Sequence, residues 1–67
     1  MTFGERLQAL REEKGLTQPA LAKELGLTQS SISKFEHGIK EPARGTLVAF
    51  AKYFSVSTDY LLGLTDK

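Results

Sequence analysis

Residues 18–37 read QPALAKELGLTQSSISKFEH and form two short amphipathic segments on either side of a glycine. The apolar residues of the two segments recur at helical spacing: Leu21, Ala22, Leu25, Ile32 and Phe35. Gly26 suits a turn between them, because glycine readily adopts the left-handed backbone conformation. Thr28 is a favourable N-cap for the segment that follows. The stretch therefore predicts two helices joined by a tight turn.

The polar residues of the second segment gather on the face opposite Ile32 and Phe35. At about 100° per residue they fall within an arc of roughly 140°: Gln29, Ser30, Ser33, Lys34 and His37. A short helix with hydrogen-bonding side chains along its exposed stripe suits the reading of base edges in the major groove of DNA. An ordinary solvated helix face has the same pattern, and the stripe alone does not separate the two interpretations.

The composition restricts the other classes of protein. The chain has 67 residues, no cysteine and one histidine, so we expect one domain without disulfides, thiolate metal sites or a multi-histidine cluster. No apolar run approaches the roughly 20 residues of a membrane span, and the start lacks the layout of a signal peptide. We therefore expect an intracellular, cytoplasmic protein. The formal net charge of +1 neither supports nor opposes nucleic-acid binding.

Five helices and no strand are predicted for the whole chain. Four of them are preceded by a hydroxyl side chain that can act as the N-cap: Thr2, Thr17, Thr28 and Ser57. Glu5 completes a capping box with Thr2, and Pro19 fits the first turn of the second helix. The fourth helix is expected to include 46–54; its start is left open, because Pro42 can open the helix or precede it and Gly45 weakens an early start. The expected core consists of Phe3, Leu7, Leu10, Leu21, Ala22, Leu25, Ile32, Phe35, Leu47, Phe50, Ala51, Phe54, Val56, Tyr60, Leu61, Leu62 and Leu64.

A family resemblance is carried by Ala22, Gly26 and Ile32, which stand at the spacing of a small residue, a turn glycine and a branched apolar residue. The runs REEKGLTQ, LAKELGLTQSSISKFEHG and VSTDYLLG extend the likeness over roughly residues 3–64. The chain resembles the Cro and phage-repressor type of helix-turn-helix domain, the lambda repressor-like family. The resemblance implies a compact all-α fold of five helices, with residues 1–67 as one domain and the motif at about 18–37.

The resemblance also implies which residues contact DNA. The base-reading positions fall on Gln29, Ser30, Ser33 and Lys34. Gln29 suits a bidentate contact to adenine, and Lys34 can reach guanine O6 and N7. Phosphate contacts are implied for Gln18, Thr28, His37, Lys40 and Arg44. The free N–H groups and dipole at a helix N-terminus favour an anion beside Gln18.

Two further sets of residues follow from the resemblance. Arg11 and Glu36 match an ion pair between the first helix and the end of the recognition helix. A homodimer interface is implied at Arg44, Thr58, Leu61 and Leu64. The function implied is that of a transcriptional regulator, in bacteria or phage, that binds a near-palindromic DNA operator as a homodimer, because one domain alone covers few base pairs. Repression by blocking the polymerase is expected, and activation remains an alternative that the sequence does not separate from it. We expect no cofactor, metal, membrane or small-molecule partner.

Two alternatives remain beside this interpretation. The same fold can serve as a protein-interaction module or as the antitoxin of a toxin pair. Enzymatic activity is not expected, because the sequence shows neither paired carboxylates, nor a nucleophile with a base, nor a phosphate-binding glycine loop, nor a set of metal ligands.

Overall fold

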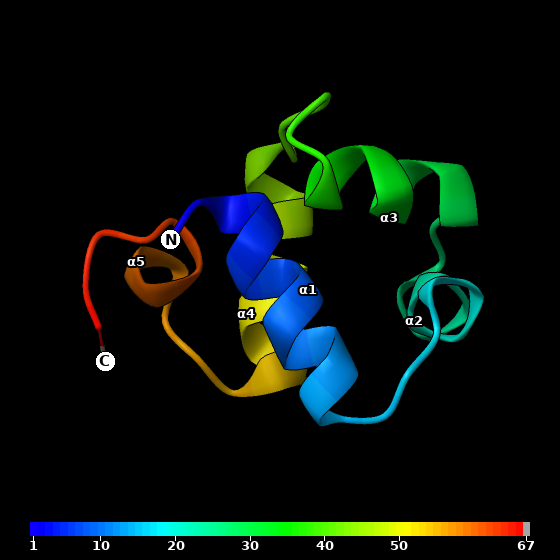
Figure 1. The fold of residues 1–67 in the computed structure, drawn as a ribbon, viewed down its shortest axis with the longest axis horizontal. Coiled ribbons are helices and arrows are strands. Elements are labelled where there is room, and N and C mark those ends of the chain that lie inside the picture. The colour runs from blue at the N-terminus through cyan, green and yellow to red at the C-terminus, as the bar shows by residue number, and fades with distance from the viewer. Residues whose placement is uncertain (67) are drawn as a thin grey trace.

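The computed structural model describes residues 1–66. This part of the chain forms five α-helices and no strand: α1 (Phe3–Glu13), α2 (Gln18–Leu25), α3 (Gln29–Glu36), α4 (Arg44–Phe54) and α5 (Thr58–Leu61). Figure 1 shows α1 crossing in front of α4, with α2 and α3 on one side and α5 on the other. None of these helices is long and apolar enough to cross a membrane. The all-α, five-helix prediction is confirmed; Lys67 lies outside the described residues.

The predicted caps are present where helices begin. The Thr2 hydroxyl accepts a hydrogen bond from the Glu5 N–H at 3.2 Å, and the Glu5 carboxylate accepts one from the Thr2 N–H at 2.9 Å. These bonds from Thr2 hold the pKa of Glu5 below its ordinary value. The stabilisation they provide is therefore present at neutral pH and is lost as the pH falls through the acid range. The other three hydroxyl caps also accept from the first turn of their helices: Thr17, Thr28 and Ser57.

The fourth helix begins before residue 46, within the range that the sequence leaves open. It starts at Arg44 rather than residue 46, and its N-cap, Ala43, makes no side-chain hydrogen bond. The first backbone bond of the helix joins the Leu47 N–H to the Ala43 carbonyl at 2.9 Å. One glycine costs a helix only about 1 kcal/mol, so Gly45 does not prevent the extra half-turn when the rest of α4 is packed against the core.

Every helix contributes one apolar side chain with no exposed surface: Leu7, Leu21, Ile32, Phe50 and Leu61. Beside them, Phe3 of α1, Phe35 of α3 and Phe50 of α4 form an aromatic cluster. The Phe35 and Phe50 rings are nearly perpendicular, with centroids 5.8 Å apart, and Phe3 lies about as close to both. This edge-to-face geometry is the one aromatic pairs favour. The cluster ties the recognition-type helix α3 to the two longest helices.

Two residues expected in the core are exposed instead. Leu62 retains 42% of its surface and Leu64 retains 72%. The reason is the length of α5, which is a single turn with one inward position, Leu61. Gly63 then turns the chain with a φ of +77°, and the Leu64 N–H bonds back to the Asp59 carbonyl. The prediction that Leu62 and Leu64 point inward was wrong.

The start of α1 approaches the end of α3 so closely that only a glycine fits at position 4. A Cβ atom added to Gly4 would lie 2.5 Å from the Glu36 carbonyl oxygen and 2.6 Å from that of Phe35. Both atoms belong to the backbone and cannot rotate away. Nothing in the sequence pattern distinguishes Gly4 from a neutral helix position, so this contact is visible only in the fold.

We predict that Gly4→Ala lowers the free energy of unfolding by about 1–3 kcal/mol, because the added methyl group forces α1 and α3 apart. Gly45→Ala is the matched control, since a Cβ there meets no atom within 4 Å; it should stabilise the helix by up to about 1 kcal/mol. Urea unfolding followed by circular dichroism measures both. Equal effects of the two substitutions would contradict the tight contact.

Candidate nucleic-acid interface

The polar stripe predicted on residues 29–37 lies on the outer face of α3. Gln29, Ser30 and Lys34 are exposed and Ser33 is half-buried. On the opposite face, Ile32 and Phe35 are buried against the rest of the molecule. The stripe is therefore presented by a helix whose other side is held in the core. Contact of these four side chains with DNA stays a prediction.

The turn between α2 and α3 has the expected geometry. Gly26 adopts the left-handed conformation at φ +68° and ψ +29°. The Leu27 N–H bonds back to the Ala22 carbonyl at 2.8 Å, which closes the end of α2. Ala22 is only 3% exposed, consistent with a position where a larger side chain would separate the two helices.

Arg11 and Glu36 form the ion pair that the resemblance implies. The Arg11 Nε donates to Glu36 Oε2 at 2.6 Å and its Nη2 donates to Oε1 at 3.1 Å. The third nitrogen, Nη1, donates to the Leu16 carbonyl at 2.8 Å. Both residues are less than one-tenth exposed. The hydrogen bonds to Glu36 raise the pKa of Arg11 above its ordinary value, although burial acts in the opposite direction.

Gln18 joins this ion pair from α2. Its Nε2 donates to Glu36 Oε1 at 3.0 Å, so one carboxylate is shared by residues of α1 and α2. The sequence predicts a phosphate contact for Gln18 but not this bond. No local pattern indicates it, because the two residues are 18 positions apart and meet only when α2 packs against the end of α3.

His37, at the end of α3, is exposed and bonds to its own helix. Its Nδ1 lies 2.7 Å from the Ser33 carbonyl oxygen and 3.4 Å from the Ser33 hydroxyl. A carbonyl oxygen only accepts hydrogen bonds, so this geometry assigns a hydrogen to Nδ1. At the other end of α3, the exposed Thr28 side chain caps the helix by accepting from the Ser31 N–H at 3.1 Å. Neither role tests the predicted phosphate contacts.

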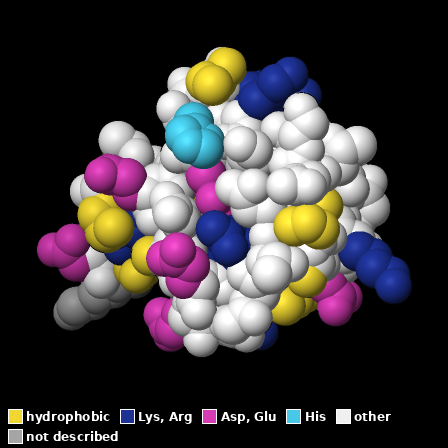
Figure 2. Space-filling model, turned by 45° about the vertical axis from the view of Figure 1, so that its right-hand side comes forward, with side chains coloured by type: hydrophobic (Ala, Val, Ile, Leu, Met, Phe, Trp, Pro, Cys, Tyr) yellow, Lys and Arg dark blue, Asp and Glu magenta, His cyan; other side chains and the backbone are white. Residues whose placement is uncertain are grey.

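The remaining predicted phosphate contacts, Lys40 and Arg44, are exposed residues that follow α3. The Ile39 and Lys40 N–H groups both bond to the Lys34 carbonyl, which holds the start of the connector against α3. In Figure 2, most acidic side chains of the visible face lie to the left of the picture, and basic side chains stand at its top and right edges and near its centre.

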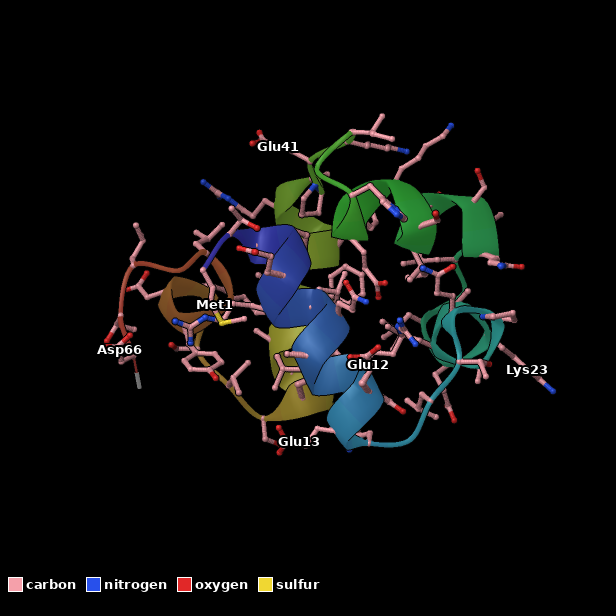
Figure 3. The ribbon with its side chains drawn as sticks, viewed as in Figure 1. Met1, Glu12, Glu13, Lys23, Glu41 and Asp66 are labelled. Atoms are coloured by element: carbon pink, nitrogen blue, oxygen red, sulfur yellow. The ribbon has the colours of Figure 1, made fainter. Side chains whose placement is uncertain are left out.

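Only some of the residues predicted for a dimer interface lie on the surface of the molecule. Leu61 is fully buried, because it is the single inward position of α5, so its assignment to an interface was wrong. Arg44 and Leu64 are exposed and Thr58 is half-buried. Figure 3 shows Met1 and Asp66 together on the α5 side of the molecule. The exposed Leu62 lies in the same segment as Leu64 and was missed as a surface residue.

Arg6 is a second buried arginine that the sequence does not reveal. It is 7% exposed, and its guanidinium carbon lies 4.0 Å from the centre of the Tyr60 ring. Its Nη2 lies 3.6 Å from the Asp66 carboxylate, while its Nε has no hydrogen-bond partner among residues 1–66. The cation–π contact fastens α5 to α1. An arginine of this kind has no signal in the sequence that separates it from a surface arginine.

A comparison with protein families matches these observations. The helix-turn-helix family model (HTH_3) matches residues 7–61, which include the turn at Gly26 and the helices on both sides. The chain belongs to the helix-turn-helix family. The resemblance proposed from the sequence is thereby confirmed.

Three related proteins bear on the function. The chain is 36% identical over 63 residues to ImmR, an HTH-type transcriptional regulator of Bacillus subtilis. The matched region covers 94% of this chain and 50% of ImmR. It is 45% identical over 62 residues to BcrR, an HTH-type transcriptional activator of Enterococcus faecalis, covering 92% of this chain and 30% of BcrR. The chain thus spans half or less of the length of these relatives.

The third is a solved structure, the crystal structure of the c2 repressor of Salmonella phage P22 in complex with a synthetic operator. It superimposes with a TM-score of 0.87 at 37% sequence identity, over 92% of this chain and 94% of the repressor chain. The five-helix arrangement is therefore shared with a domain solved on its operator.

We predict that Glu36→Ala lowers the free energy of unfolding by about 3–5 kcal/mol, because it leaves Arg11 buried without its charged partner. Thermal unfolding measures the effect. Glu24→Ala, on the exposed surface of α2, is the control and should stay within about 0.5 kcal/mol of the unmodified chain. An unchanged midpoint for Glu36→Ala would show that the ion pair does not support the fold.

Proposed function

We propose that this chain is a sequence-specific DNA-binding transcriptional regulator, acting as a repressor on a bacterial or phage genome. The observation that carries the proposal is the exposed stripe of α3, whose opposite face is buried in the core. An α-helix with its side chains is about 10–12 Å across, which matches the width of the major groove, about 12 Å. Gln29, Ser30, Ser33 and Lys34 are the proposed base-reading residues. The P22 repressor, solved on an operator, supports this role for the same arrangement.

The proposed phosphate contacts surround the stripe on two sides. Gln18 and Thr28 lie at the N-termini of α2 and α3, where unpaired N–H groups favour an anion. His37, Lys40 and Arg44 follow the C-terminal end of α3 and supply donors there. Contacts on both sides of the stripe would set the register of the helix in the groove without reading sequence.

We further propose that the chain binds a near-palindromic operator as a homodimer. A single short helix discriminates too few base pairs to select one site in a genome. Two copies with recognition helices one helical turn of DNA apart read both half-sites. The exposed Arg44 and Leu64, with Leu62 and the half-buried Thr58, are the surface we assign to this contact. Leucine side chains in water favour such burial.

We predict that replacing Gln29, Ser30 and Lys34 together by alanine abolishes specific DNA binding and leaves folding intact, because all three side chains are exposed. Each lost base contact costs about 1–3 kcal/mol. Binding is measured by fluorescence anisotropy and folding by circular dichroism. Lys52→Ala on α4 removes the same charge and is the control. Full binding by the triple variant would exclude α3 as the reading helix.

Selection from a randomised duplex pool at near-physiological salt tests the proposal as a whole. We expect two inverted half-sites with centres about 10 base pairs apart. Enrichment of one short half-site would keep the reading helix and contradict the dimer. If a folded sample enriches no sequence, specific DNA reading by this chain is wrong, and a role as a protein-interaction or antitoxin module takes its place.

A further inference from the structure

The carboxylate of Glu36 has two partners with different roles. Its bonds to Arg11 account for its burial and its charge. Its bond to Gln18 satisfies no buried cation and joins it instead to a half-buried amide at the first residue of α2. One oxygen of the buried Glu36 carboxylate therefore accepts a hydrogen bond that orients Gln18, a side chain at the edge of the candidate interface.

The bond determines which end of the Gln18 amide faces Glu36. A primary amide has an acceptor end and a donor end of nearly the same shape, so an unrestrained glutamine can present either one. An ionised carboxylate accepts only, and the amide nitrogen must therefore face it. A DNA phosphate also accepts only, so it needs the same nitrogen. With one hydrogen directed to Glu36, the second hydrogen of Nε2 remains as the donor.

We propose that Glu36 is a positioning residue for DNA binding. It fixes the Gln18 amide with its nitrogen toward the carboxylate, so that the second N–H of this nitrogen donates to a phosphate of the DNA backbone. This inference rests on the proposed function. Glu36, which holds the end of α3 through Arg11, thereby also holds the phosphate-contacting side chain of α2. The reading helix α3 and the contact of Gln18 with the DNA backbone then keep a fixed position relative to each other. Arg11 neutralises the carboxylate, which keeps its charge from repelling the nearby phosphate.

A double-mutant cycle separates positioning from a merely structural role. Gln18→Ala is measured in the unmodified chain and in the Glu36→Gln background, with duplexes that carry the selected site. Position 36 then keeps its size but offers an N–H as well as an oxygen, so the Gln18 amide is no longer held in one orientation. Glu36→Asp is the second background, because it keeps the charge opposite Arg11 and withdraws the carboxylate from Gln18.

Gln18→Ala should weaken binding about tenfold in the unmodified chain, as expected for loss of a hydrogen bond to a charged group. It should have no effect in either Glu36 background, where the contact is already lost. Gln8→Ala is the matched control, since Gln8 donates to Glu12 along the surface of α1; it should leave binding unchanged. All measurements are made at a temperature where circular dichroism shows each variant folded.

A second readout uses duplexes in which each phosphate is replaced in turn by an uncharged methylphosphonate. For the unmodified chain, replacement of one particular phosphate per half-site should lower the affinity. The same replacement should not change the affinity of Gln18→Ala or of either Glu36 variant. If Gln18→Ala costs the same in all backgrounds, or if the Glu36 variants keep the phosphate sensitivity, Glu36 serves the fold alone and the inference is overturned. Absence of specific binding by the unmodified chain would overturn the proposed function and the inference together.

Discussion

The shared carboxylate of Glu36 is the constraint on which the arrangement of the first three helices depends. It receives the guanidinium of Arg11 from α1 and the amide of Gln18 from α2, while its own backbone ends α3. A buried ion pair adds little net stability compared with apolar packing, because both charges lose their hydration. The ion pair instead determines how the helices are oriented. Its two directed hydrogen bonds accept only one relative orientation of the helices, whereas apolar contacts tolerate small rotations.

Apolar packing supplies the energy that this orientation requires. The ring cluster of Phe3, Phe35 and Phe50 joins α1, α3 and α4, and the close approach at Gly4 brings the first turn of α1 against the last turn of α3. Protein interiors are close-packed, so α3 has little freedom to tilt. In so small a domain, each of these contacts forms a large share of the core.

The functional surface follows from that rigidity. The four polar side chains of the α3 stripe have no individual feature that distinguishes them from those of an ordinary solvated helix face. In the proposed function they form a reading surface because a helix held by the core presents them together, with hydrogen-bond donors before and after it. A helix that moved by an ångström would lose the geometry that base contacts need, since hydrogen bonds weaken steeply with distance and angle. The resemblance in fold to a repressor solved on its operator is consistent with this requirement.

The amino-acid sequence by itself determined the local features. Hydroxyl caps, turn glycines and helical periodicity act over three or four residues, so the five helices, four hydroxyl caps and the polar stripe of α3 could be predicted without the fold. The Arg11–Glu36 pair was predicted only through the family resemblance. The predictions fell short where local signals end: the start of α4 stayed open, and Leu62 and Leu64 face outward because α5 is a single turn.

Only the tertiary structure decided which distant residues meet. The bond between Gln18 and Glu36, the absence of space at Gly4 and the burial of Arg6 on the Tyr60 ring each join elements far apart in the chain. No periodicity encodes such contacts, because they depend on the angles at which whole helices pack. These angles are set by the shapes of all the buried side chains together.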